Sequence, residues 1–160
     1  MSSLNVLIVE DNRQMVEVIR AVLSGLGDQR AEFATGIDAG WGRLQAEDFD
    51  YVIVDRNLGD GDGVELVRRI RDPKRCRNPY IPILMLTGSG ERRVVAAARD
   101  AGVSEFLIKP FTVAAMADRL TALINRPRPF IQSPDYFGPD RRRRNDPEYK
   151  GAERRKGRAP

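Results

Sequence analysis

The chain has 160 residues, of which 41% are hydrophobic, enough for one folded domain with a buried core. No apolar run approaches the roughly 20 residues of a membrane-spanning helix, and no signal peptide is visible at the N-terminus, so a cytoplasmic protein is expected. A single cysteine, Cys76, excludes an internal disulfide, and the sequence contains no histidine. Histidine nucleophiles, histidine general bases and histidine-ligated metals are therefore excluded.

Charge and composition divide the chain into two parts. Residues 1–125 carry 16 basic and 18 acidic side chains, whereas residues 126–160 carry 11 basic and 5 acidic ones. Six of the ten prolines lie after residue 125, and there arginine outnumbers lysine nine to two. We therefore predict a mildly acidic domain, residues 1–125, followed by a flexible arginine-rich tail, residues 126–160, in which no core can form.

In chain order, the first part alternates between short apolar runs and amphipathic stretches. The predicted strands cover residues 5–10, 30–34, 51–55, 83–87 and 105–109. The predicted helices cover residues 13–26, 37–47, 63–71, 91–101 and 113–125. Residues 72–82 contain three prolines and are predicted to be a solvated loop. This alternation predicts an α/β fold, a five-stranded parallel sheet with helices on both faces, in the flavodoxin-like order 2-1-3-4-5.

Polar side chains stand at four of the predicted strand ends. The first strand ends in Glu10 and Asp11, the third in Asp55, the fourth in Thr87 and the fifth in Lys109. Ligands of parallel sheets bind at the carboxyl ends of the strands, and these four strands are contiguous in the predicted order. We therefore expect the five side chains to converge on one site.

These residue types favour phosphoryl chemistry on a carboxylate. Clustered carboxylates repel one another unless a cation intervenes, and Mg²⁺ prefers such oxygen ligands and commonly bridges to a phosphate. Asp55 is the natural nucleophile, because a carboxylate can form an aspartyl-phosphate. Lys109 supplies a positive charge and Thr87 a hydroxyl donor for the group being transferred.

At these residues the chain resembles the receiver domain of bacterial response regulators, the CheY-like fold, over about residues 4–125. The resemblance implies that Asp55 accepts a phosphoryl group from a histidine kinase or a phosphotransfer protein. It also implies that Thr87 and Lys109 contact that group and that Phe106 is an aromatic switch residue. The implied Mg²⁺ ligands are Glu10, Asp11, Asp55 and the backbone carbonyl of Asn57. The motifs that carry the resemblance are Glu10-Asp11, Asp55 with Asp62-Gly63, Thr87-Gly88 and the run from Phe106 to Phe111.

Three positions depart from the usual pattern of that family. Glu10 replaces the more common Asp in the acidic pair, and Gly59 replaces the usual Pro in the loop after Asp55. Gly88 stands where Ala is common after the Thr. The smaller residue at position 88 is expected to admit water and to shorten the lifetime of a phosphoryl group on Asp55.

The basic tail is open to three interpretations. A solvated charge run is the simplest one. Binding of nucleic acid or another anionic surface is disfavoured, because acidic side chains interrupt the arginines. The third interpretation is a guanine nucleotide, because arginine binds the O6 and N7 edge of guanine in a bidentate manner and stacks on bases.

The tail resembles the arginine-rich extension of the Cle group of CheY-like proteins, which bind cyclic di-GMP and dock on the flagellar motor. The resemblance covers about residues 130–155. It implies that the tail folds onto a cyclic di-GMP dimer, with Tyr136 stacking on a base. The implied ligand residues are Tyr136, Asp140, Arg141, Arg142, Arg143, Arg144 and Asp146.

Together these features predict a single-domain response regulator whose tail binds cyclic di-GMP and controls docking to a protein partner. No enzyme acting on an external substrate is expected, because the only chemistry in view is phosphoryl transfer to Asp55 itself. The alternative is a plain phospho-accepting relay protein in which Asp55 is the only switch. The tail would then serve partner, nucleic-acid or surface binding.

Overall fold

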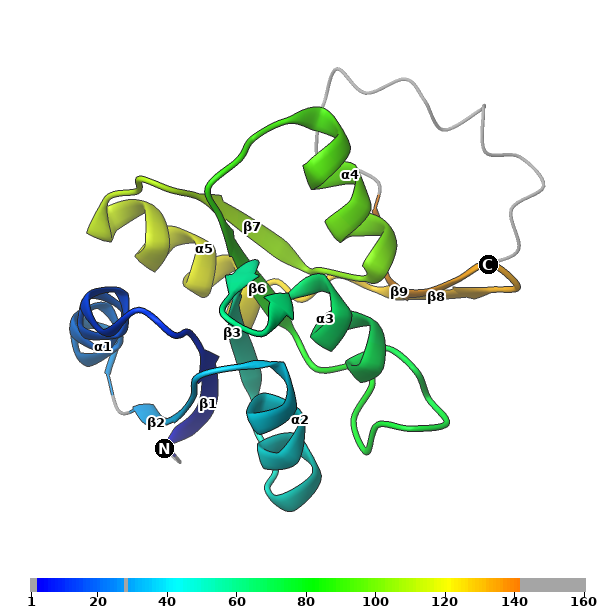
Figure 1. The fold of residues 1–160 in the computed structure, drawn as a ribbon, viewed down its shortest axis with the longest axis horizontal. Coiled ribbons are helices and arrows are strands. Elements are labelled where there is room, and N and C mark those ends of the chain that lie inside the picture. The colour runs from blue at the N-terminus through cyan, green and yellow to red at the C-terminus, as the bar shows by residue number, and fades with distance from the viewer. Residues whose placement is uncertain (1–2, 28, 142–160) are drawn as a thin grey trace.

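The fold is built on one parallel sheet, seen in the computed structural model, which describes residues 3–27 and 29–141 (Figure 1). Its strands are β1 (Leu4–Val9), β2 (Gln29–Ala34), β3 (Tyr51–Asp55), β6 (Ile83–Thr87) and β7 (Glu105–Ile108). They lie in the order β2-β1-β3-β6-β7, and every neighbouring pair is parallel. The predicted flavodoxin-like order is therefore confirmed.

Five helices cover the two faces of this sheet. They are α1 (Arg13–Gly25), α2 (Ile37–Ala46), α3 (Val64–Ile70), α4 (Arg92–Ala101) and α5 (Val113–Asn125). The apolar residues of α1 and α5 share one core cluster, whereas those of α2, α3 and α4 share the other (Figure 1). Because β1, β3 and β6 are buried on both faces, they are continuous apolar runs. None of these helices is both long and apolar enough to cross a membrane, in the part of the chain that the structure describes.

The ends of the helices follow from local chemistry. Asn12 caps α1 by accepting from the backbone N–H of Met15 at 3.1 Å, and Thr112 caps α5 in the same way through Ala115 at 3.0 Å. The helix α4 ends at Gly102, whose φ of 110° lies in the left-handed region that glycine adopts without strain. The observed bounds of the five sheet strands and the five helices differ from the predicted ones by at most one residue at either end.

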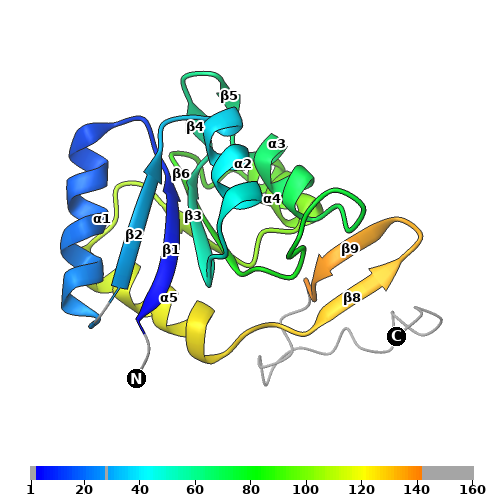
Figure 2. The same cartoon turned by 90° about the horizontal axis from the view of Figure 1, so that it is seen from below.

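Two small antiparallel hairpins were not predicted. The first joins β4 (Asn57–Leu58) to β5 (Gly61–Asp62) directly after β3. The second joins β8 (Phe130–Ser133) to β9 (Tyr136–Pro139) in the segment after α5. Figure 2 shows that they lie at opposite ends of the molecule.

The β8–β9 hairpin corrects the prediction for the tail. Its aromatic residues pack on Tyr80: the ring centroid of Tyr80 lies 5.1 Å from that of Phe130 and 5.3 Å from that of Phe137. Tyr136 is buried, and its hydroxyl donates to the carbonyl of Pro139 at 2.7 Å. The prediction that no packed structure follows Asn125 is wrong for residues 126–141, because these aromatic side chains supply a small core. The rest of the predicted tail lies outside the described residues.

Arg71, the residue after α3, joins the segments that lie beside the β8–β9 hairpin. Its guanidinium is buried and donates to the backbone carbonyls of Gly102 at 2.8 Å, Pro79 at 2.7 Å and Ile81 at 2.6 Å. The same guanidinium lies 4.9 Å from the ring centroid of Phe130. Burial lowers the pKa of this group. Residues 72–82 are therefore not simply a solvated loop, because two of their carbonyls are bound inside the protein.

Candidate functional site

The predicted strand ends converge at the carboxyl edge of the sheet. Asp55 ends β3 and Thr87 ends β6, and Glu10 follows β1 directly. Asp55, Thr87 and Glu10 are 3%, 2% and 2% exposed, so three polar side chains are buried together. Such burial is costly unless each group has a partner or a function.

Lys109 lies between the two buried carboxylates. Its Nζ atom is 2.5 Å from Oδ2 of Asp55 and 3.8 Å from Oε1 of Glu10. The other oxygen of Asp55, Oδ1, accepts from the backbone N–H of Asn57 at 2.9 Å. The peptide bond between Lys109 and Pro110 is cis. The Lys109 ammonium group is thus the positive charge near both the Asp55 and the Glu10 carboxylates, so the two carboxylates together carry more negative charge than it can neutralise.

Glu10 shows this excess most clearly. Its Oε2 atom accepts from the N–H of Asp11 at 3.1 Å, whereas its Oε1 atom is buried without a hydrogen-bond partner among the described residues. Burial raises the pKa of the Glu10 carboxyl well above its usual value, and the neighbouring Asp55 carboxylate raises it further. Lys109 lowers it by less. A cation beside Glu10 and Asp55 would relieve this repulsion.

The predicted metal ligands are only partly assembled. Glu10 and Asp55 meet in the buried site, but Asp11 and Asn57 are exposed. Among the described residues, no group of three acidic, histidine or cysteine side chains is arranged to hold a metal ion. The chemistry of the donors nevertheless fits Mg²⁺, because they are hard oxygens with an unpartnered buried atom among them. A complete set of ligands requires the Asp11 side chain to turn toward the other two.

Thr87 is positioned beside the nucleophile by the sheet register. Its neighbour in β7 is Ile108, and the residue before it, Leu86, is paired with Asp55. The hydroxyl of Thr87 donates to the carbonyl of Ser89 and accepts from the N–H of Ser89, both at 3.3 Å. These bonds are long, so the hydroxyl can exchange them for a stronger acceptor. A side chain at Gly88 would meet no atom within 4 Å.

The loop after Asp55 carries two acidic residues whose capping contacts the sequence did not reveal. Both carboxylate oxygens of Asp60 accept from the N–H of Ile37, at 2.9 and 3.1 Å, and so cap the start of α2. Asp62 accepts from the N–H of Val64 at the start of α3 and pairs with Arg56 at 3.4 Å. The only signal in the sequence was Gly36, a residue before α2 with no side chain to act as a cap.

Phe106, the predicted switch residue, lies in β7 and packs partly buried against the core shared by α2, α3 and α4. The guanidinium of Arg99 on α4 is 5.6 Å from its ring centroid. The aromatic ring therefore touches both the sheet and α4.

Of the tail residues that were predicted to bind a ligand, the structure describes Tyr136, Asp140 and Arg141. Tyr136 is 8% exposed and Asp140 4% exposed, and the guanidinium of Arg141 covers the Tyr136 ring at 4.2 Å from its centroid. Arg141 also pairs with Asp100 of α4 at 2.6 Å. Stacking of a base on Tyr136 therefore requires Arg141 to move. Arg142, Arg143, Arg144 and Asp146 lie outside the described residues.

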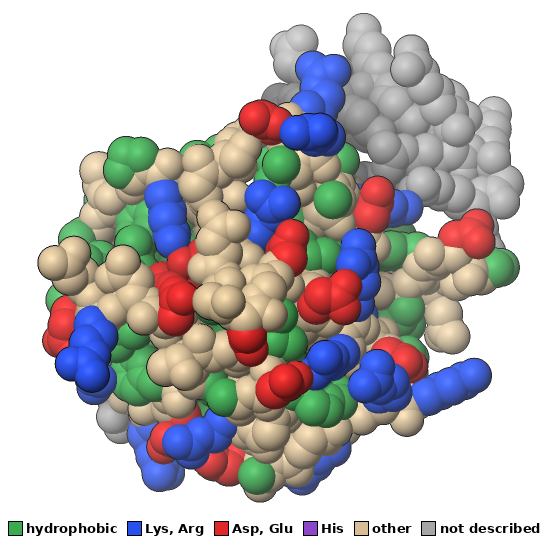
Figure 3. Space-filling model, in the orientation of Figure 1, with side chains coloured by type: hydrophobic (Ala, Val, Ile, Leu, Met, Phe, Trp, Pro, Cys, Tyr) green, Lys and Arg blue, Asp and Glu red, His purple; other side chains and the backbone are tan. Residues whose placement is uncertain are grey.

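The face that carries the β4–β5 hairpin shows acidic side chains near its middle, with Lys and Arg around them (Figure 3). A five-stranded parallel sheet with buried carboxylates and a lysine at its carboxyl edge is typical of one protein family, and a comparison with family models identifies it. The model of the response regulator receiver domain matches residues 6–121, and the chain belongs to this family. Membership implies a histidine kinase or another phosphodonor as partner.

Within that family, the chain is similar to chemotaxis proteins. It is 32% identical to chemotaxis protein CheY1 of Helicobacter pylori over 123 residues, which are 76% of this chain and 97% of the relative. It is 29% identical to CheY-3 of Vibrio cholerae over 124 residues, covering 78% and 94%. The receiver domain of the sensor histidine kinase PA1611 from Pseudomonas aeruginosa, solved with magnesium in its active site cleft, superposes with a TM-score of 0.67 at 27% identity, covering 78% and 99%. The protein is a CheY-like response regulator.

Proposed function

We propose that Asp55 is the phosphoacceptor of this protein. The observation that supports this most is the buried Asp55 carboxylate with Lys109 at 2.5 Å on one oxygen and the Asn57 N–H at 2.9 Å on the other. An oxygen of Asp55 attacks the phosphorus of the donor. The bond between phosphorus and the donor breaks with its electron pair staying on the donor. The product is an acyl phosphate on Asp55.

Lys109 and Thr87 receive the transferred group. As the charge of the Asp55 carboxylate passes to the phosphoryl oxygens, the Lys109 ammonium follows it and pairs with one of them. The Thr87 hydroxyl exchanges its long bond with Ser89 for a bond to another phosphoryl oxygen. The positions of the Lys109 ammonium and the Thr87 hydroxyl would then depend on whether Asp55 is phosphorylated. The movement of Thr87 leaves space for Phe106 to turn inward.

Glu10, Asp11, Asp55 and the Asn57 carbonyl would hold Mg²⁺ in the reactive state. When bound, the cation supplies positive charge that offsets the carboxylates and the phosphoryl oxygens. The unpartnered Oε1 atom of Glu10 and the raised pKa of that carboxyl support this assignment. The magnesium in the cleft of the PA1611 receiver domain supports it as well.

The test is phosphorylation with a small phosphodonor such as acetyl phosphate, followed by intact mass. The wild-type chain should gain one phosphoryl group in the presence of Mg²⁺ and none with a chelator. The Asp55→Asn variant should gain none, whereas Asp60→Asn, which removes a carboxylate that only caps α2, should still be modified. Modification of the Asp55→Asn variant to the wild-type extent would contradict the assignment.

We infer further that the arginine-rich tail binds cyclic di-GMP and controls docking to a protein partner in the cytoplasm, with the flagellar motor as the candidate partner. The support is the series of arginines that begins at Arg141, directly after the hairpin that fastens the tail to the domain. Guanidinium groups bind both the phosphates and the O6 and N7 edge of guanine. The pairing of Arg141 with Asp100 would let ligand binding act on α4.

Calorimetric titration of cyclic di-GMP into the full chain tests this part. We expect micromolar or tighter binding that weakens as salt rises, because the contacts are charge-assisted. Alanine at positions 142–144 should abolish binding. Alanine at positions 154–156, which removes the same number of positive charges from the same tail, should change it little. If the wild-type chain does not bind, Asp55 alone is the switch and the protein is a phospho-accepting relay.

A further inference from the structure

The strand β2 forms an edge of the sheet, and its outer side has no partner strand among the described residues. It stands at the end of the strand order, so β1 is its one neighbour in the sheet. Residues 29–33 are all at least partly exposed. Figure 2 looks onto this edge and shows no other element in front of β2. An open edge of this kind can pair with a further strand.

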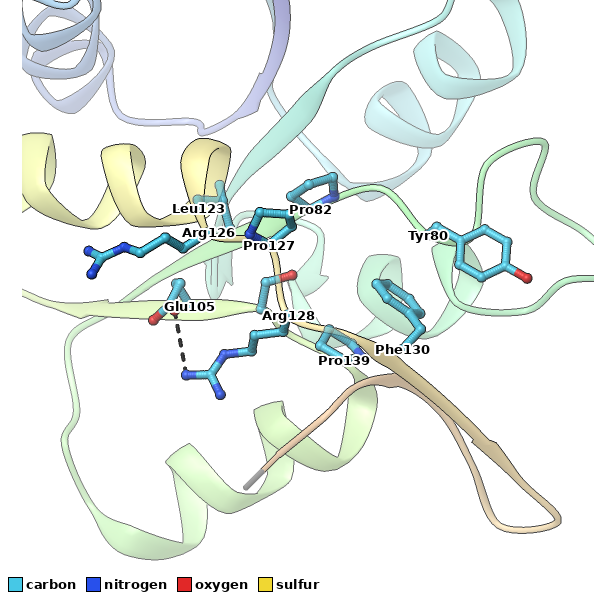
Figure 4. Close-up of a pocket in the computed structure, with 10 residues that line it drawn as sticks. Tyr80, Pro82, Glu105, Leu123, Arg126, Pro127, Arg128, Phe130 and Pro139 are labelled. Carbon is cyan, nitrogen blue, oxygen red and sulfur yellow. Dashed lines mark hydrogen bonds and ion pairs between the residues drawn. The ribbon is translucent and has the colours of Figure 1, made fainter. Parts of the chain in front are cut away.

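The opposite edge strand, β7, is covered at its start. Glu105 lies there and pairs with Arg128 at 3.5 Å, where the segment after α5 passes the strand (Figure 4). Arg128 also donates to the carbonyl of Asp140 at 3.2 Å, which joins the end of the β8–β9 hairpin to the same place. The chain therefore covers part of one edge of its sheet and leaves β2 open.

The ladder with β1 shows which backbone groups of β2 point outward. The N–H of Glu10, which follows β1, donates to the carbonyl of Ala34 at 2.9 Å, so Ala34 directs its backbone groups toward β1. In a strand, the N–H and C=O of one residue point to the same side, and successive residues alternate. Every second residue before Ala34 therefore also faces β1. The residues between them, Gln29, Ala31 and Phe33, present their backbone groups to the outside.

Two charged side chains of opposite sign lie on either side of Ala31. Arg30 is exposed, and Glu32 pairs with Arg43 of α2 at 3.3 Å while 41% of its own side chain stays exposed. Both side chains lie on the same face of the sheet, because they are two residues apart. Charged residues on an edge strand normally discourage pairing with another strand. Here their order favours one pairing, with an antiparallel copy of the same strand.

The register of that pairing follows from the backbone and the charges together. An antiparallel pair centred on Ala31 sets Ala31 opposite the partner's Ala31 and Gln29 opposite the partner's Phe33, so outward backbone groups meet and exchange hydrogen bonds. It also sets Arg30 opposite the partner's Glu32, in the pairs whose side chains are closest. Moving the centre by one residue would set Arg30 opposite the partner's Arg30, or Glu32 opposite the partner's Glu32. Like charges in such pairs are destabilising.

We propose that a second copy of this chain docks on β2, with the two β2 strands antiparallel about a twofold axis at Ala31. The sheet then continues through both copies, and Arg30 pairs with the partner's Glu32 on each side of the axis. Because the paired strands run in opposite directions, the carboxyl edges of the two sheets face opposite ways and the Asp55 site of each copy stays open. The proposal depends neither on phosphorylation of Asp55 nor on cyclic di-GMP.

The experiment is sedimentation velocity of the full-length protein without nucleotide or phosphodonor. The concentration series should reach about 1 mM, because pairing through one short strand gives a small interface and weak association. We expect a monomer–dimer equilibrium. Arg30→Glu and Glu32→Arg each set like charges opposite one another, so each should weaken association about tenfold or more. The double variant, which carries both substitutions, restores opposite charges and should recover the wild-type dissociation constant.

Ala31→Pro tests the backbone pairing. The N–H of Ala31 points outward, so proline removes hydrogen bonds between the two copies and none to β1. This variant should stay monomeric at every concentration, and thermal unfolding should show that it is folded. Arg93→Glu makes the same change of charge as Arg30→Glu on α4, where the side chain is 88% exposed, and should leave association unchanged.

Two results would overturn the proposal. One is a wild-type chain that stays monomeric over the whole concentration series. The other is a dimer that neither Ala31→Pro nor Arg30→Glu weakens, because the two copies would then meet through another surface.

Discussion

The two ends of the molecule both bury charge, and they do so in opposite ways. At the carboxyl end of the sheet, two carboxylates share one ammonium group, and an oxygen of Glu10 has no hydrogen-bond partner among the described residues. At the hairpin end, Arg71 is equally buried, but three backbone carbonyls accept from its guanidinium. A buried charged group whose hydrogen bonds are all made stabilises the structure. A buried charged group that lacks partners is available to bind a ligand or to react.

This difference makes Arg71 the residue whose loss should cost most. In Arg71→Ala the carbonyls of Pro79, Ile81 and Gly102 lose their donor, and each unsatisfied buried group costs about 1–3 kcal/mol. We expect the free energy of unfolding to fall by about 3 kcal/mol or more, measured by urea denaturation. Arg69 lies two residues before Arg71 and forms an ion pair with the exposed Asp38, so Arg69→Ala should cost less than about 1 kcal/mol. Equal losses in the two variants would contradict the structural role of Arg71.

Substitution of Glu10 should have the opposite effect to substitution of Arg71, because it should raise the free energy of unfolding at high pH. The folded-state pKa of Glu10 is raised, so its contribution to stability is fully present below the unfolded-state value of 4.5 and is lost as pH rises through the raised value. In metal-free protein, Glu10→Gln should therefore gain stability relative to wild type as pH rises from about 5 to about 9, by roughly 1–3 kcal/mol. Added Mg²⁺ should reverse this advantage, because the metal favours the ionised carboxylate of the wild type.

The control for Glu10 is Asp11→Asn, which removes a carboxylate that is adjacent in sequence but exposed. It should weaken Mg²⁺ binding without the pH-dependent gain in stability. Denaturation at several pH values, with and without Mg²⁺, measures both effects. If the free energy of unfolding of Glu10→Gln equalled that of the wild type at every pH, burial would not destabilise the ionised Glu10 carboxylate.

At the hairpin end, Tyr136→Phe sharpens the comparison. The substitution removes only the hydroxyl that donates to the carbonyl of Pro139, while the ring keeps its contact with Arg141. The expected loss is about 1 kcal/mol in the free energy of unfolding. Hydrogen exchange of residues 130–139 should rise in the variant, and a hairpin whose exchange is unaffected would contradict a fastening role for this bond.

At the carboxyl end of the sheet, Gly88→Ala should have the smallest effect. The added methyl group meets no atom within 4 Å, so it should fold without strain and exclude water from Asp55. We expect dephosphorylation to slow by roughly two- to tenfold, measured by the decay of the phosphorylated mass. Gly42→Ala, which also places a methyl group in open space but on α2, should decay at the wild-type rate. Faster decay in Gly88→Ala would refute the argument.

The sequence predicted the parts of the molecule that depend on short-range patterns. Buried strands such as β3 are continuous apolar runs, and each strand end that carries a reactive group is visible as a single polar residue such as Asp55. The order of the strands follows from handedness rules. These features predicted the sheet and the approach of Lys109 to Asp55 and Glu10 at its carboxyl edge.

The parts that the sequence did not predict depend on contacts between distant residues. Arg71 is one of several arginines near the end of α3, and only the folded chain distinguishes it by placing the carbonyl of Gly102, 31 residues away, against it. The β8–β9 hairpin lies in a segment rich in proline and charge, and its aromatic residues Phe130 and Phe137 pack on Tyr80, which is about 50 residues earlier in the chain. Capping of α2 by Asp60 likewise joins residues 23 positions apart.

The hairpin also changes the mechanics of α4. The C-terminal end of this helix is fastened by Arg71 at Gly102 and by the pairing of Arg141 with Asp100, while its first residue, Arg92, follows a short loop from Thr87. A helix of ten residues is about 15 Å long, so a tilt of about 10° around the fastened end moves the other end by roughly 2.6 Å. The hairpin and the loop after Thr87 are therefore joined through one rigid helix, so a change in the position of the hairpin would alter the tilt of α4.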